Sequence, residues 1–140
     1  MTVKQISVFL ENQPGKLAEF AAVLSAQKIN LRAISVAEAS DFGIVRIIVD
    51  DVFNAVTVLK SENYICSITD VIAVEIADEP GKLAEMIAAL GAEGINIEYM
   101  YTILGKKADV AYMIIRTNDE TKAAKILDAK GFKLAALDKI

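Results

Sequence analysis

The chain has 140 residues, 54% of them hydrophobic and 24% charged, and a formal net charge of −4. This composition supports a folded core and excludes a disordered chain, and the length allows one ordinary domain or two small ones. The absence of histidine excludes Ser-His-Asp and Cys-His catalysis and any histidine-ligated metal site.

Neither half of the chain is basic. Residues 1–69 carry 6 Lys and Arg against 7 Asp and Glu, and residues 70–140 carry 9 against 12, so we expect no nucleic-acid partner. No apolar run reaches the roughly 18 residues of a membrane span, and the first residues lack the pattern of a signal peptide. We therefore expect a cytoplasmic protein with no membrane partner.

In chain order, the first half begins with a strand, because "KQISVFLE" (4–11) alternates apolar and polar residues. After Pro14-Gly15, an apolar face of helical spacing follows at Leu17, Phe20, Ala21 and Leu24. Strands are expected at about 30–38 and 43–50. A helix opens at an acidic cluster near residue 50, where negative charge suits a helix N-terminus, and a strand at 64–68 ends the half.

The second half repeats this pattern. "PGKLAE" occurs at 14–19 and again at 80–85, an offset of 66 that also relates Asn30 to Asn96. The expected core positions of the first strands follow the same offset: Ile6, Val8 and Leu10, and Ile72, Val74 and Ile76. Later the offset is 68, as between Leu59 and Leu127, so two extra residues are expected in a loop at 104–109.

The second helix face is expected at Leu83, Met86, Ile87 and Leu90. Strands are then expected at 96–104 and 110–117, a helix at 118–128 and a last strand at 132–137. The order is βαββαβ, twice, which predicts an α+β fold of two tandem ferredoxin-like sandwiches with antiparallel sheets. We expect the domains to be 1–69 and 70–140, with only Thr69-Asp70 between them.

The Pro-Gly turn has several possible roles. Asn12 and Asp78 are suitable helix N-caps, and proline suits a first helical turn. Gly15 and Gly81 imply a conformation that only glycine allows, tight packing against the sheet, or the close approach of a ligand. A helix N-terminus offers unpaired N–H groups to a carboxylate, and Asn30 and Asn96, each 15 residues after the glycine, could bind a carboxylate or an amino group.

The Asx-X-Pro-Gly-X-Leu-Ala sequence, the Ile-Asn that follows and the βαββαβ order together resemble the ACT domain. Nearly the whole chain resembles two tandem ACT units, like the small stand-alone tandem ACT proteins that carry no attached enzyme. The resemblance implies a regulatory protein, not an enzyme, that binds a free amino acid or similar metabolite between units. It also implies a homodimer, a possible regulated enzyme acting in trans, and no cofactor or metal.

Carried over to this sequence, the resemblance implies two ligand sites, each formed by a Pro-Gly loop and an asparagine-bearing strand start. The first comprises Asn12, Gln13, Pro14, Gly15, Asn30 and Leu31, and the second comprises Asp78, Glu79, Pro80, Gly81, Asn96 and Ile97. Because only the second loop is acidic, we hypothesise that the sites differ in affinity or that one stays empty; calorimetry that found two identical sites would refute this.

Other observations leave alternatives open. Tyr99 and Tyr101 either line a pocket or, as we favour, pack on the sheet. Cys66 lies in an apolar run and is expected to be a small buried hydrophobe rather than a reactive thiol. An RNA-binding module, a metallochaperone and an acylphosphatase-like hydrolase each lack their required residues. A dimerisation or scaffolding module without a ligand remains the main alternative to a sensor.

Overall fold

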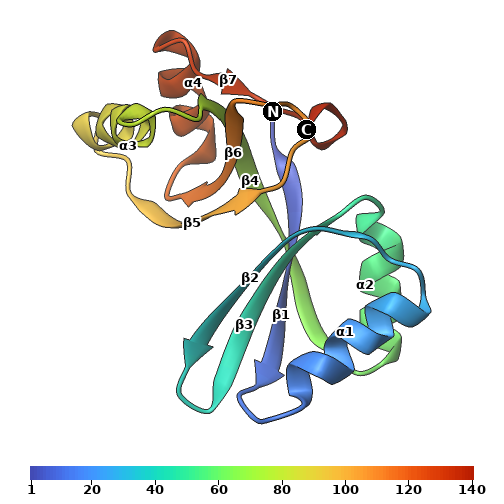
Figure 1. Cartoon of the computed structure of the whole chain (residues 1–140). Coiled ribbons are helices and arrows are strands. Elements are labelled where there is room, and N and C mark those ends of the chain that lie inside the picture. Colours follow the sequence, from blue (N-terminus) through green and yellow to red (C-terminus); the bar gives the residue numbers. More distant parts are fainter. The chain divides into compact units, whose positions relative to one another are not determined.

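The computed structural model describes all residues from Met1 to Ile140. The chain forms two compact units (Figure 1). Lys4–Thr69 is hereafter the first unit, and Asp70–Ile140 together with Met1–Val3 is the second unit. The division falls within one long strand, β4, which runs from Ile65 to Ala77 and contributes residues to both units.

The first unit has the predicted βαββαβ order. Its elements are β1 (Val3–Glu11), α1 (Lys16–Ala26), β2 (Leu31–Ala39), β3 (Phe42–Val49), α2 (Val52–Ser61) and the start of β4. The strand order across the sheet is β2-β3-β1-β4. Strand β3 pairs antiparallel with both β1 and β2, with Ile47 opposite Ile6 and Ile34. Both helices lie on one side of these strands (Figure 1).

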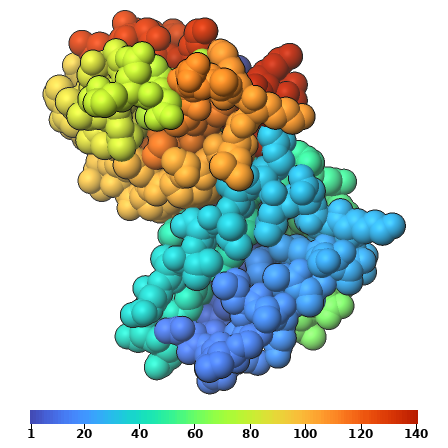
Figure 2. All heavy atoms as spheres, in the orientation of Figure 1, coloured from blue at the N-terminus to red at the C-terminus, as the bar shows by residue number.

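The second unit repeats the order with a shortened end. The rest of β4 is followed by α3 (Lys82–Ala92), β5 (Ile97–Ile103), β6 (Val110–Thr117), α4 (Glu120–Ala129), β7 (Lys133–Leu134) and a 3₁₀ helix, η1 (Leu137–Lys139). The strand order is β7-β4-β6-β5, and β4 pairs antiparallel with β6 and β7. The adjoining yellow-green and red atoms in Figure 2 are those of α3 and of the chain's last elements, including α4. The prediction of two tandem ferredoxin-like units is confirmed.

Two strand predictions are wrong in detail. The strands expected on either side of Thr69-Asp70 are the single strand β4, because neither residue is a glycine or proline that would end an extended segment. The strand expected at 132–137 is only Lys133–Leu134, which pairs with Val74 and Glu75. Two alanines follow, a residue type that is uncommon in strands, and the chain then turns into η1.

Each unit has its own apolar core between sheet and helices. All six predicted strand positions are buried, from Ile6 to Ile76, and so are the helix residues Phe20, Leu24, Met86 and Leu90. The predicted helix faces are otherwise too wide, because Leu17 is 43% exposed and Ile87 is 38% exposed. Leu83, the repeat equivalent of Leu17, packs against the core of the second unit, so the two helix faces differ at this position.

The second helix of each unit begins as predicted, at an acidic residue. Asp51 caps α2 by accepting a hydrogen bond from the Asn54 N–H at 3.1 Å, and Asp119 caps α4 by accepting one from the Lys122 N–H at 3.0 Å. Each carboxylate satisfies a donor that the helix itself leaves unpaired.

Candidate functional site

The Pro-Gly loops of the two units have nearly the same backbone. Gly15 has φ 87° and ψ −17°, and Gly81 has φ 90° and ψ −14°. The hydrogen bonds also repeat: the Asn12 N–H donates to the Asp41 carbonyl at 3.0 Å, as the Asp78 N–H does to the Asp109 carbonyl at 2.9 Å. The loop is therefore a duplicated structure as well as a duplicated sequence.

Asn12 and Asp78 do not cap the helices, and that prediction is wrong. Gly15 and Gly81 occupy the cap positions, and neither α1 nor α3 has a side-chain cap. The Asn12 side chain instead donates to the Ser40 carbonyl at 3.1 Å. A tight turn separates Asn12 from the helix, because the Lys16 N–H donates a hydrogen bond to the Gln13 carbonyl. The Asn12 side chain is therefore not placed to accept hydrogen bonds from the first N–H groups of α1.

The two glycines are required by conformation rather than by packing. Their positive φ angles lie in the left-handed region, which disfavours every residue with a Cβ atom. A Cβ atom added at either position would meet no atom within 4 Å, which excludes tight packing against the sheet. The space beside each glycine is open, and the first N–H groups of α1 and α3 lack a side-chain acceptor.

The asparagines of the predicted sites lie at the opposite end of the first helix of each unit. Asn30 and Asn96 are exposed and immediately precede β2 and β5. Helix α1 has 11 residues, so its two ends are about 16 Å apart. A free amino acid is shorter than this, so the Pro-Gly loop and the asparagine of one unit cannot contact it together.

Leu31 and Ile97, the other strand residues of the predicted sites, are half-buried and pack against the core of their own unit. Their side chains therefore hold the strand start in place. Gln13, Pro14, Glu79 and Pro80 are exposed and stay available at the loops.

Comparison with known proteins identifies the family of this fold. A family model described as an ACT domain pair matches residues 1–138. The chain belongs to this family. The matched residues contain two ACT units and no catalytic domain. No curated protein matches the chain in sequence.

Solved structures agree with this assignment. Protein BT0572 from Bacteroides thetaiotaomicron is 40% identical, with a TM-score of 0.91 over 99% of this chain and 95% of that chain. The ligand-free regulatory subunit of aspartate kinase from Thermus thermophilus is 20% identical, with a TM-score of 0.66 over 91% of this chain and 92% of that one. The corresponding subunit from Thermus flavus is 19% identical, with a TM-score of 0.63 over 90% of each chain. At these lower identities the two subunits share the fold of the ACT pair.

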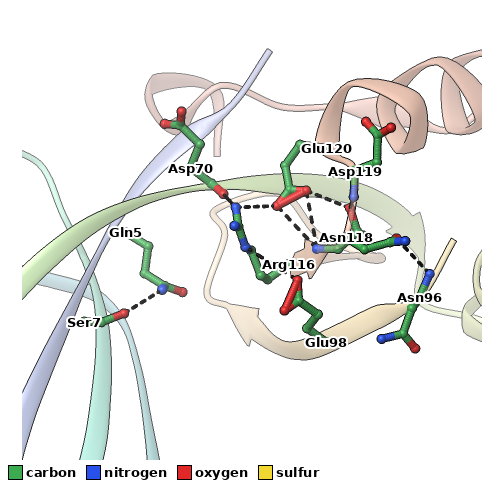
Figure 3. Close-up of polar contacts among 10 residues, drawn as sticks. Gln5, Ser7, Asp70, Asn96, Glu98, Arg116, Asn118, Asp119 and Glu120 are labelled. Atoms are coloured by element: carbon green, nitrogen blue, oxygen red, sulfur yellow. Dashed lines mark hydrogen bonds and ion pairs between the residues drawn. The ribbon is translucent and has the colours of Figure 1, made fainter.

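In the second ACT unit, the strand start at Asn96 is fixed through its backbone. The Asn96 N–H donates to Asn118 Oδ1 at 3.0 Å (Figure 3). The Asn118 N–H in turn donates to the Asn96 carbonyl at 3.2 Å. The Asn96 side-chain amide takes no part in this pairing. In the first ACT unit the equivalent of Asn118 is Asp50, which instead forms an ion pair with Arg32 at 3.0 Å.

A polar cluster beside Asn96 was not predicted from the sequence. Arg116 Nη1 donates to Glu120 Oε1 and to the Asp70 carbonyl, both at 2.9 Å (Figure 3). Glu120 also accepts from the Thr117 hydroxyl at 2.7 Å. These contacts join β4, the end of β6 and the start of α4, so the cluster holds the ends of three elements together. Thr117 and Glu120 have the Thr-x-x-Glu spacing of a capping box, a local signal that could have indicated this part of the cluster. The contact between Arg116 and Asp70 joins residues 46 positions apart in the sequence, so no local pattern could reveal it.

The remaining sequence predictions concern side chains near the sheets and cores. Tyr99 and Tyr101 stack on each other at a centroid distance of 6.4 Å, as expected for packing on a strand. Cys66 is half-buried against the first core, and this burial raises the pKa of its thiol. It therefore stays protonated at neutral pH. The structure contains no cluster of three metal-ligating side chains. None of its helices has the length and hydrophobicity of a membrane span.

Proposed function

We propose that this ACT pair is a regulatory module that binds an amino acid or a similar small metabolite between two ACT units. The carboxylate of the ligand is bound by the uncapped helix start behind one Pro-Gly loop, comprising Asn12, Gln13, Pro14 and Gly15 or Asp78, Glu79, Pro80 and Gly81. The strand start of another unit, Asn30 and Leu31 or Asn96 and Ile97, binds the rest of the ligand.

One observation carries this proposal: both first helices begin at a left-handed glycine with open space and no side-chain cap. Free N–H groups and the positive end of the helix dipole attract a carboxylate there. The length of α1 supports a site shared by two units, because loop and asparagine of one unit are about 16 Å apart. We infer that the second unit is supplied by another copy of the chain, in a homodimer.

The regulatory role is supported by the family and by the names of two structural neighbours, both regulatory subunits of aspartate kinase. A ligand that binds one arrangement of units more tightly than another shifts the population toward that arrangement. The output of this module is then a change of assembly, or the control of an enzyme in trans, within the cytoplasm.

A thermal-shift screen of the standard amino acids tests the proposal. A ligand at about 100 times its Kd adds roughly 2.7 kcal/mol to the free energy of unfolding. Asn30→Ala and Asn96→Ala are expected to weaken this response without lowering the melting temperature of the free protein. Asn54→Ala, the same change at an exposed position of α2, is the control.

Two results would count against the proposal. If no amino acid shifts the melting temperature, the chain is better explained as a dimerisation or scaffolding module. If Asn30→Ala and Asn96→Ala both respond like Asn54→Ala, the asparagines are not part of the site. Measuring molecular mass by light scattering, with and without the ligand, then tests whether binding changes the assembly.

A further inference from the structure

Each ACT unit has a pocket that is separate from the ligand sites proposed above. No residue of the Pro-Gly loops or of the asparagine-bearing strand starts lines it. The first pocket, about 410 Å³, lies between the end of β1, the first turns of α1, the start of β3 and the turn from α2 to β4. The second pocket, about 320 Å³, lies between the same elements of the second unit. Every lining residue of the first pocket has its repeat equivalent in the second, so the duplication preserved the position of the pocket.

The apolar part of the pocket is similar in the two units. Leu10 in the first pocket corresponds to Ile76 in the second, and Tyr64 corresponds to Phe132. The rim is different: Glu62 in the turn after α2 corresponds to Lys130 after α4, and Ile65 corresponds to Lys133. The two pockets therefore share a shape and differ in charge.

The charges that have no ion pair are negative in the first pocket and positive in the second. In the first pocket Lys16 pairs with Glu19 at 3.7 Å, which leaves the carboxylates of Glu11 and Glu62 without an ion pair. These two carboxylates disfavour an anionic ligand in that pocket.

In the second pocket the charged side chains are paired differently. Lys82 pairs with Glu85 at 3.5 Å, and Glu75 pairs with Lys107 at 3.0 Å. Lys130 and Lys133 have no ion pair, and both side chains are exposed at the pocket. Two ammonium groups on one rim attract a ligand with two negative charges.

We propose that the second pocket is a binding site for a small organic dianion, such as a dicarboxylate or a phosphate monoester. Lys130 and Lys133 bind the two anionic groups, and Phe132 contacts the apolar part of the ligand. The first pocket, with the same shape and the opposite charge, excludes this ligand. The site is separate from the one proposed at the Pro-Gly loops, so either can fail without the other.

Lys130 could be present only because it stabilises the end of α4, but this would not explain why the first pocket has a glutamate at the equivalent position. Lys130 is the residue at the C-terminal end of α4, where a positive charge suits the helix dipole. The equivalent residue in the first unit is Glu62, with the opposite charge, and α2 still ends there. The fold therefore does not require a lysine at this position.

A titration of the ¹⁵N-labelled full chain, followed by amide chemical shifts, tests the proposal. The probes are succinate and inorganic phosphate at constant ionic strength, because exposed charges are screened by salt. Saturable shifts are expected at residues 130–133 and not at 62–65. Tighter binding of succinate than of phosphate assigns the dicarboxylate class, and the reverse order assigns the phosphate monoester class.

Charge exchange between the pockets provides matched variants. Lys130→Glu with Lys133→Ile gives the second pocket the rim of the first and is expected to bind at least about tenfold more weakly. Lys106→Ile with Lys125→Glu makes the same changes away from this pocket and is expected to bind like the unaltered chain. Conversely, Glu62→Lys with Ile65→Lys is expected to create anion-dependent shifts at 62–65.

The proposal is overturned if neither probe gives saturable shifts in the unaltered chain. It is also overturned if the control pair weakens binding as much as the pocket pair, because the anions then associate with lysines in general. Far-ultraviolet circular dichroism of each variant checks the fold, and the gain of binding at 62–65 cannot arise from loss of structure.

Discussion

The same substitution, glycine to alanine, is expected to have opposite effects at two positions of the second unit. Gly81 precedes α3 with φ 90°, whereas Gly91 lies within α3. A Cβ atom added at either glycine meets no atom within 4 Å, so no packing contact is gained or lost. The effect of the substitution at each position therefore reflects the backbone conformation alone.

The expected magnitudes follow from that conformation. At Gly81, alanine in the left-handed region costs about 1–2 kcal/mol, and reduced freedom of the unfolded chain returns about 0.4–1 kcal/mol. Gly81→Ala should therefore lower the free energy of unfolding by roughly 0–1.6 kcal/mol, with a central value of about 0.8 kcal/mol. At Gly91, alanine has a higher helix propensity than glycine, so Gly91→Ala should raise the free energy of unfolding by about 0.5–1 kcal/mol.

Urea unfolding followed by circular dichroism measures both changes. With a slope of about 2 kcal/mol per molar urea, 1 kcal/mol moves the midpoint by about 0.5 M. Gly81→Asn is the control, because asparagine tolerates the left-handed region and should cost less than alanine. If Gly81→Ala stabilises the protein as Gly91→Ala does, the conformational explanation of the Pro-Gly loop is wrong.

Four further predictions concern the cores, a helix cap and two titratable groups. Leu90→Ala, at a fully buried position, should destabilise the second unit by about 2–5 kcal/mol in urea unfolding. Asp119→Ala should cost about 1 kcal/mol by the same assay, because it removes the cap of α4. Burial, Glu19 and Glu62 raise the pKa of Tyr64. The folded state therefore holds the phenol proton more tightly than the unfolded state, so the free energy of unfolding is constant below the ordinary tyrosine pKa and falls as the pH rises from there through the raised value. Glu62→Gln should lower that pKa in an ultraviolet titration, with a Tyr64→Phe variant as the blank. Cys66, whose thiol pKa is raised by burial, should react more slowly with a thiol reagent at pH 8 in the folded protein than in urea; equal rates would contradict its packing against the core.

The sequence by itself determined the repeat, the order of the elements and most of each core. Alternation of apolar residues in β1 and β4, and helical spacing in α1 and α3, are local patterns that arise from backbone geometry, so one sequence suffices to read them. For the glycines at 15 and 81 the sequence left a special backbone conformation, tight packing and a nearby ligand open. Their positive φ angles in the structure show the special conformation.

Only the tertiary structure decided how the ends of the elements are arranged. Three features depend on contacts between distant segments: whether β4 continues past Thr69, where α1 begins, and whether Leu17 packs against the core. The same is true of the pockets, whose rims combine the end of one strand, the start of a helix and a turn some fifty residues later. Charge at such a rim is the sum of residues that are far apart in the sequence, so it becomes visible only when the fold brings them together.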